Sequence, residues 1–208
     1  IIGKDGAMYF AIGGRRTQSA VYRVTYVGKE STAPAAPPLE TPEHMLRVEL
    51  ERLHEEGAGA EAIDKAWPHL GHPDRLVRYA ARVAIERQPA QLWADRALKH
   101  TMLWAEPWAA LECSVALARM GGTERQNDVL TLLNGLDFVP LTAPQQLALI
   151  RAYQITLARS GVPAGEILAT TTVRLDALYP AQTNDINREL SRTLVALGAP
   201  SAVPKTVA

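Results

Sequence analysis

Few residues in this sequence have the type and spacing that a chemical site needs. His69 and His72 could bind a metal ion together, because imidazoles are common metal ligands. They straddle a predicted helix end and no third ligand lies nearby in the sequence, so we predict no metal site. Arg15 and Arg16 lie in a predicted hairpin loop and are candidates for binding a cofactor. The alternative interpretation is a solvated or packing loop.

The single cysteine limits the redox chemistry of the chain. One cysteine excludes an intramolecular disulfide and a zinc site built on cysteines, and the C-x-x-C-H motif for covalent haem attachment is absent. Cys113 lies in a predicted helix beside Leu111 and Val115, and the sequence places no base near it. We therefore predict a buried, inert thiol rather than a nucleophile, and no catalytic residue in this segment.

The composition narrows the functional classes. The 208 residues carry 22 basic and 22 acidic side chains, so the net charge is zero. A balanced charge offers no broad electrostatic attraction for DNA, RNA or an anionic membrane. No apolar run approaches the roughly 20 residues that a membrane-spanning helix needs. We therefore predict a globular protein with neither a nucleic-acid partner nor a membrane span.

The first 28 residues predict an antiparallel β-hairpin. Residues 7–12 and 20–27 are the β-prone runs, and a loop rich in glycine joins them. In the second run, Tyr22 and Val24 share one face of the strand, as the two-residue period of a strand requires. A hairpin alone is marginal in water. We therefore predict that it belongs to a larger sheet, which this chain does not supply.

The rest of the chain predicts a linker and then helices. Residues 29–41 contain three prolines and small polar residues, which is typical of a semi-extended spacer. Residues 42–208 form a domain of helices with short connections, which favours antiparallel neighbours. The predicted helices cover about 42–57, 60–70, 73–88, 89–99, 107–121, 123–134, 142–160, 163–178 and 183–198. Residues 200–208 predict the start of a further helix, so both ends of the sequence look internal and the helical domain looks truncated.

One helix carries a recognisable motif. Residues 73–85 fit the frame Asp-x-x-Val-Arg-x-x-Ala-x-x-Ala-aliphatic, which resembles the second helix of a HEAT repeat. Its apolar positions fall on one helix face, where alanines allow a neighbouring helix to pack closely. Arg78 is placed to reach an acidic group in an adjacent repeat. The motif residues are Asp74, Val77, Arg78, Ala81, Ala84 and Ile85.

Weaker signals extend the repeat pattern. Glycines that end predicted helices stand at positions 71, 121, 161 and 198, and the spacing between them is close to the roughly 40–47 residues of HEAT and armadillo repeats. We therefore expect a mainly α fold, a HEAT-like α-solenoid of antiparallel helices preceded by a short N-terminal hairpin.

Four tryptophans are concentrated in the first half of the helical region. Packing within the core and between repeats is the first interpretation of Trp67, Trp93, Trp104 and Trp108. A docking face for a peptide or domain is the alternative, because aromatic side chains often anchor interfaces.

The hairpin residues also resemble a known family. Asp5 to Phe10, Gly13 to Arg15 and Val21 to Val24 resemble the last blade of β-propellers of the soluble glucose/sorbosone dehydrogenase type. The order of hairpin and helical region is similar to large bacterial membrane-bound dehydrogenases, in which a HEAT-like region and a cytochrome c domain follow the propeller. The resemblance implies an exported, periplasmic parent that oxidises a sugar or alcohol and transfers electrons to haem c, with pyrroloquinoline quinone as cofactor. It places no cofactor in this segment.

Three functional hypotheses remain. In the first, the helical region is a non-catalytic scaffold that docks the adjacent propeller and cytochrome domains of the parent chain. In the second, it is a stand-alone HEAT-repeat module that binds a protein or peptide. An enzyme built into the helices ranks last, because no acid–base or metal constellation is visible in the sequence.

Overall fold

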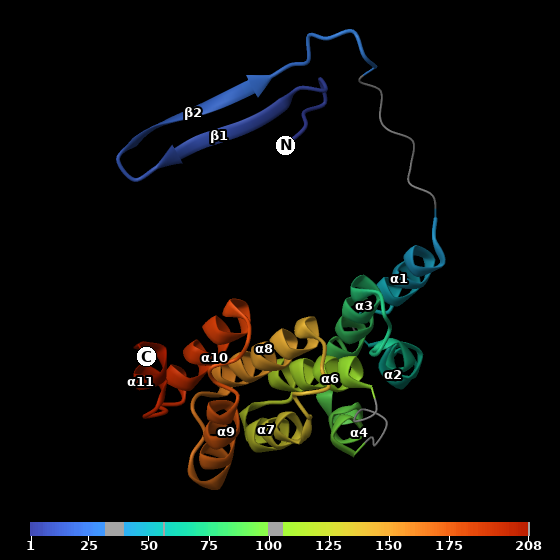
Figure 1. Ribbon diagram of the computed structural model, residues 1–208. Helices are drawn as coiled ribbons and strands as arrows, with labels where there is room; N and C mark the ends of the chain where they lie inside the picture. The colour runs from blue at the N-terminus through green and yellow to red at the C-terminus, as the bar shows by residue number, and fades with distance from the viewer. Residues whose placement is uncertain (32–39, 56, 100–105, 208) are drawn as a thin grey trace. The chain divides into compact units, whose positions relative to one another are not determined.

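The computed structural model describes residues 1–31, 40–55, 57–99 and 106–207. It contains ten α-helices and one two-stranded antiparallel sheet among these residues, so the chain is mainly helical (Figure 1). The chain divides into two compact units, Ile1–Leu39 and Glu40–Ala208, which are described separately below.

The first unit is the predicted hairpin, with a tighter turn than expected. Strand β1 spans Met8–Gly14 and β2 spans Thr17–Val24, and the two are antiparallel. The sequence predicted a loop over residues 13–19, but pairing continues to Gly14 opposite Thr17. Arg16 has a φ of 68°, so this left-handed residue closes a two-residue turn and the strands lengthen into the expected loop.

The two faces of the hairpin differ in chemistry. One face carries aromatic and aliphatic side chains that remain 43–46% exposed, namely Met8, Phe10, Ile12, Tyr22 and Val24. The rings of Phe10 and Tyr22 stack there, with their centroids 5.3 Å apart. The apolar face is therefore uncovered within this unit.

The opposite face carries a polar cluster. Tyr9 donates its hydroxyl to Asp5 Oδ2 at 2.8 Å, and Arg23 Nε donates to the same oxygen at 3.1 Å. The hydrogen bond from Tyr9, followed by that from Arg23, lowers the pKa of Asp5 to about 2. The cluster ties the turn before β1 to the end of β2.

The second unit contains all ten helices. They are α1 (Pro42–Arg52), α2 (Gly59–Ala66), α3 (Arg75–Glu86), α4 (Ala94–Lys99), α6 (Pro107–Met120), α7 (Gln126–Gly135), α8 (Ala143–Ser160), α9 (Gly165–Ala177), α10 (Asn184–Ala196) and α11 (Ala202–Val207). Two predicted N-cap residues are confirmed. The Thr41 side chain accepts a hydrogen bond from the backbone amide of His44, and the Asp74 side chain accepts hydrogen bonds from the amides of Leu76 and Val77. Three predicted bounds are wrong, because 3₁₀ turns replace part of the expected α-helix: Ala90–Leu92 precedes α4, Thr123–Arg125 precedes α7, and Trp67–His69 follows α2.

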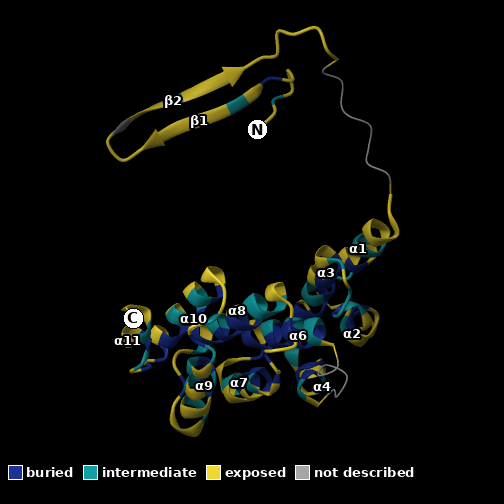
Figure 2. Ribbon diagram, in the orientation of Figure 1, coloured by how far each residue is buried: buried dark blue, intermediate teal, exposed yellow. Residues whose placement is uncertain are grey.

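The helices form two layers. Helices α1, α3, α6, α8 and α10 pack side by side in one layer, and α2, α4, α7 and α9 lie in the other (Figure 1). The buried residues lie between the layers (Figure 2). Val77, Ala81 and Ala84 are fully buried in α3, as their spacing predicts. No helix among the described residues is long and apolar enough to cross a membrane.

The two units should differ in local stability. In the hairpin Ala7 is buried whereas the apolar face is exposed, while Val77 and Ile85 of α3 lie in the core. We expect backbone amides of residues 8–24 to exchange hydrogen much faster than those of residues 75–86, because few buried contacts oppose opening of the hairpin. Hydrogen exchange followed by mass spectrometry measures this. Equal protection of the two segments would contradict it.

Candidate functional site: charged and polar clusters between helices

Arg78 is a buried cation in the motif helix α3. Its side chain is 4% exposed, and Nη1 donates to the carbonyls of His72 and Pro73 at 2.7 and 2.9 Å. The guanidinium carbon lies 3.9 Å from the ring centroid of Trp108 on α6, a cation–π contact. Nε lies 3.7 Å from Oε1 of Glu112, also on α6. Arg78 therefore does reach an acidic group, and it fixes the segment before α3 against α6.

A chain of alternating charges continues this contact. Arg82 on α3 donates from Nε to Glu112 at 2.8 Å and from Nη1 to Glu86 at 2.5 Å. Glu86 also accepts a hydrogen bond of 3.0 Å from Arg119 on α6. The α3–α6 charge cluster, defined as Arg78, Arg82, Glu86, Glu112 and Arg119, thus crosses between the two helices three times.

Burial sets the electrostatics of this cluster. Glu86 and Glu112 have side chains only 6% and 17% exposed. Loss of hydration raises the pKa of Glu112, although Arg82 and Arg78 oppose the shift. Burial likewise lowers the pKa of Arg78, a shift that Glu112 opposes. The cluster therefore holds opposite charges where little water reaches them. Each charged side chain there is stabilised by the opposite charges of its neighbours.

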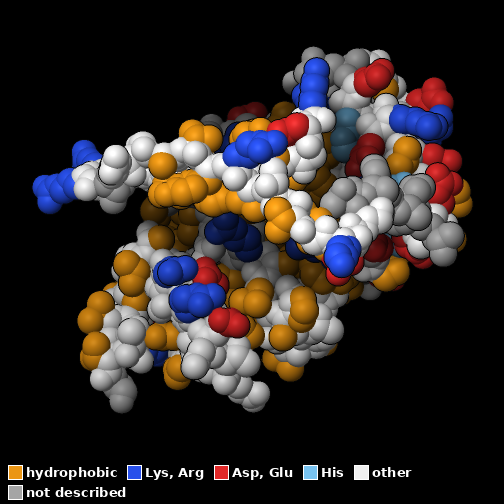
Figure 3. Space-filling model, turned by 90° about the horizontal axis from the view of Figure 1, so that it is seen from above, with side chains coloured by type: hydrophobic (Ala, Val, Ile, Leu, Met, Phe, Trp, Pro, Cys, Tyr) orange, Lys and Arg blue, Asp and Glu red, His pale blue; other side chains and the backbone are white. Residues whose placement is uncertain are grey.

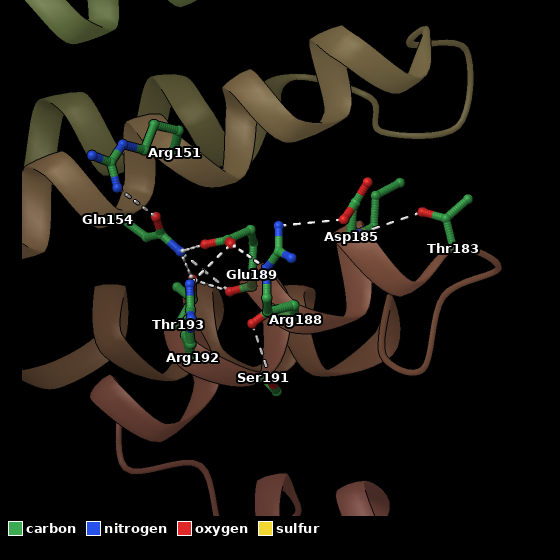
Figure 4. Close-up of polar contacts among 10 residues, drawn as sticks. Arg151, Gln154, Thr183, Asp185, Arg188, Glu189, Ser191, Arg192 and Thr193 are labelled. Atoms are coloured by element: carbon green, nitrogen blue, oxygen red, sulfur yellow. Dashed lines mark hydrogen bonds and ion pairs between the residues drawn. The ribbon is translucent and has the colours of Figure 1, made fainter.

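A second cluster joins α8 to α10 (Figure 4). Gln154 of α8 donates from Nε2 to the Glu189 carboxylate at 3.0 Å and to the Thr193 hydroxyl at 3.2 Å. Arg188 and Arg192 hold the other carboxylate oxygen at 3.0 and 3.1 Å. The hydrogen bonds from Gln154 and Arg188 lower the pKa of Glu189. This α8–α10 polar cluster aligns the two helices through one amide side chain.

The second layer has contacts of the same kind. Arg96 of α4 bonds Asp64 of α2 at 2.5 Å and lies over the ring of Trp67. Asn134 of α7 donates to Thr171 of α9 at 3.0 Å. Both layers are therefore linked from helix to helix by polar side chains.

The candidate residues for metal and cofactor binding lie apart from these clusters. Arg15 and Arg16 occupy the hairpin turn, are exposed, and make no hydrogen bond or ion pair with another described residue. The rings of His69 and His72 are 6.4 Å apart, and His72 Nδ1 accepts the backbone amide of Asp74. Among the described residues no group of three or more His, Cys, Asp or Glu side chains is arranged to hold a metal ion.

The aromatic and cysteine candidates are mostly buried. Trp67 and Trp93 are 7% and 1% exposed, and the Trp93 indole donates to the carbonyl of Gln88, so both fit the packing interpretation rather than an open docking face. Trp108 is half-buried against Arg78, and Trp104 lies outside the described residues. Cys113 is buried as predicted, and burial raises the pKa of its thiol.

Comparison with known proteins adds no family. No protein-family profile matches the sequence, and no curated protein and no solved structure matches it. The function is therefore argued from the clusters themselves.

Sequence reasoning found one side of these contacts. The motif predicted that Arg78 has an acidic partner, but it did not indicate which residue that partner is. Glu112, Gln154 and Glu189 were missed, because each stands in an ordinary polar position of a helix. A search for polar residues one helical pair further along the chain could have found them. Glu112 follows Arg82 by 30 residues, and Glu189 follows Gln154 by 35 residues.

Removing Arg82 should be costly, because both carboxylates that it neutralises are buried. We expect Arg82→Met to lower the free energy of unfolding by about 3 kcal/mol, the lower end of the cost of breaking a buried ion pair, because Arg119 and Arg78 still lie near the two carboxylates. The matched control is Arg125→Met, which breaks pairs with the exposed carboxylates of Asp95 and Asp128 and should change stability by less than about 1 kcal/mol. Urea unfolding followed by far-UV circular dichroism measures both, and equal effects would contradict the cluster's role.

The raised pKa of Glu112 gives a pH dependence with a defined sign. The folded protein holds the Glu112 proton more tightly than the unfolded chain, whose value is near 4.5. Glu112 therefore contributes stability below pH 4.5 that is lost as the pH rises through its folded pKa. We expect the stability of the wild type relative to Glu112→Gln to fall as the pH rises from 4.5 towards 8. Urea unfolding at several pH values tests this, and a relative stability that rises with pH would overturn it.

Proposed function

We propose that the helical unit is a HEAT-like α-solenoid whose function is positional. One observation carries this proposal: polar bonds between neighbouring helices of a layer join residues at similar separations, somewhat shorter than the roughly 40–47 residues of HEAT and armadillo repeats. The separations are 30, 33, 35 and 37 residues for the pairs Arg82–Glu112, Glu86–Arg119, Gln154–Glu189 and Asn134–Thr171. Contacts at a nearly constant separation, in both layers, are what stacked helical pairs produce.

A solenoid of this kind acts as a spacer. Each helical pair contacts its neighbours only, so the row holds whatever is attached to its ends or faces at a fixed distance. The α3–α6 charge cluster resists sliding of one pair past the next, because a shift would separate buried charges from their partners. In the α8–α10 polar cluster a shift would break the hydrogen bonds of Gln154 to Glu189 and Thr193.

We infer that the parent is a propeller dehydrogenase–cytochrome c protein of an exported, periplasmic kind. In this reading the hairpin is the end of a β-propeller, and the rest of that propeller covers its apolar face. The exposed Phe10 and Tyr22 support the inference, because a two-stranded sheet with an open apolar face requires a partner. The parent would oxidise a sugar or alcohol and pass electrons from the propeller to the cytochrome.

This chain's own residues do not fit either cofactor of such a parent. Pyrroloquinoline quinone is a polyanion that would need converging cations, whereas Arg15 and Arg16 are exposed in the hairpin turn. Haem c needs two cysteines and a histidine in one motif, whereas Cys113 is single and buried in α6. The redox chemistry therefore belongs to other domains of the parent, and the segment contributes their spacing.

The reading frame around this segment tests the proposal. Propeller blades encoded upstream and a C-x-x-C-H motif downstream would support a spacer between a dehydrogenase and a cytochrome. A start codon close to Ile1 and a stop codon close to Ala208 would overturn that reading. The helical unit would then be a stand-alone repeat module that binds a protein or peptide.

A further inference from the structure

Helix α8 carries two cations that no described carboxylate neutralises. Arg151 and Arg159 are exposed, and neither makes an ion pair with an acidic side chain among the described residues. Arg151 donates to the amide oxygen of Gln154 at 3.3 Å, and Arg159 donates to the backbone carbonyl of Arg119 at 2.9 Å. Both acceptors are uncharged, and α8 contains no acidic residue of its own. Each guanidinium therefore keeps its positive charge and further donors for a partner.

The neighbouring helices place more arginines beside these two. Arg119 of α6 is 48% exposed and bonds a single carboxylate through Nε. On α10, Arg188 and Arg192 are 56% and 66% exposed and share one carboxylate oxygen of Glu189 (Figure 4). Helix α8 packs against both α6 and α10, so these side chains belong to one surface. We define the α8 arginine face as Arg119, Arg151, Arg159, Arg188 and Arg192.

The layer that contains this face has an excess of positive charge. Helices α3, α6, α8 and α10 together contain eight arginines, no lysine and four carboxylates. The zero net charge of the whole sequence hides this excess, because residues outside these four helices carry the compensating negative charge. Figure 3 views the molecule from the side of this layer and shows Lys or Arg side chains next to Asp or Glu side chains on the helical unit.

We propose that the α8 arginine face binds an acidic segment of a partner protein. Arginine presents its donors in a planar fork that matches a carboxylate, so aspartate and glutamate side chains are suitable partners. The inference goes beyond the positional role of the helical unit. It uses only the packing of α8 between α6 and α10, and it does not depend on the identity of the parent.

The spacing of the cations along α8 indicates how the acidic residues of the partner are spaced. Arg151 and Arg159 are eight residues apart on one helix, which separates them by about 12 Å along its axis. An extended peptide advances about 3.3 Å per residue, so carboxylates about four residues apart match this distance. Half-buried Ile155 lies between the two arginines in the sequence and offers an apolar contact to the residues between the carboxylates.

Carboxylates within the face favour a protein segment over a nucleic acid. Glu189 and the exposed Asp185 lie among the arginines of α10 and pair with Arg188. A nucleic acid carries a phosphate at every nucleotide, so it would bring negative charge close to both carboxylates. A peptide carries acidic side chains only where its sequence places them. It can therefore pair with the cations of α8 and place neutral residues against Asp185.

Fluorescence anisotropy of labelled peptides mixed with the full 208-residue chain tests the proposal. The probe is an otherwise uncharged Gly-Ser peptide with glutamate at every fourth position, and its control has glutamine at those positions. We expect the glutamate peptide to bind at low salt and more weakly as the salt concentration rises, and the glutamine peptide not to bind. Absence of binding by the glutamate peptide at low salt would overturn the proposal.

Two double variants with the same loss of charge locate the binding surface. Arg151→Met with Arg159→Met removes two charges from α8 and should weaken binding of the glutamate peptide about tenfold, the effect of losing two exposed charge contacts. The control, Lys65→Met with Arg125→Met, removes two charges from α2 and from the start of α7 and should bind as the wild type does. Circular dichroism checks the fold of both variants. Equal weakening in the two variants would show binding through overall charge and contradict a site on α8.

A single-stranded DNA oligonucleotide with the same net charge as the glutamate peptide separates the two classes of anionic partner. We expect it to bind the wild type more weakly than the peptide does, because its evenly spaced phosphates meet Asp185 and Glu189. Tighter binding of the oligonucleotide would overturn the assignment of this face to an acidic protein segment.

Discussion

The arrangement of the helical unit depends on how charge is buried between α3 and α6. Arg78 and Glu86 are 4% and 5% exposed, positions in which an isolated charge would be strongly unfavourable. They are tolerated because Arg82 joins Glu86 to Glu112, and Glu112 in turn faces Arg78. A shift of α6 along α3 would break several of these pairs at once. The cluster therefore contributes more to the register between α3 and α6 than to the net free energy of unfolding. Replacing a whole buried ion cluster by apolar side chains often leaves that free energy unchanged.

Small side chains make this charge cluster geometrically possible. Ala80, Ala81 and Ala84 of α3 are at most 1% exposed, and Ala109 and Ala110 line the same core from α6. Short side chains let two helices approach closely, so long polar side chains at the edges of the contact can bridge them. The aliphatic contact and the charged contact are thus parts of one interface: the alanines set its distance and the arginines set its register.

Much of this could be predicted from the sequence, because it depends on local pattern. The β-prone runs give the hairpin, and Thr41 and Asp74 mark helix starts, since each signal involves residues close together in the chain. The two-residue turn at Arg16 was missed because a left-handed non-glycine residue leaves no mark in composition. The helix predicted from residue 89 failed where Trp93 is drawn into the core and its backbone leaves helical angles.

The polar clusters lie beyond that kind of prediction for a physical reason. Gln154 and Glu189 become partners only when α8 and α10 lie side by side, and a glutamine at that position is equally suited to solvent. The motif in α3 was informative because Arg78 is an arginine on the buried side of an amphipathic helix, where a cation must find a counter-charge. A polar residue on a buried face thus predicts that a partner exists, while the fold alone decides which residue it is.

The order of the helices within each layer underlies the positional role that we propose for the helical unit. When each helix of a layer packs on the next in a single register, the distance between the two ends of the layer is fixed. Interior helices have neighbours on both sides within their layer and further contacts across to the other layer, as α6 does with α3 and α8 and with α4 and α7.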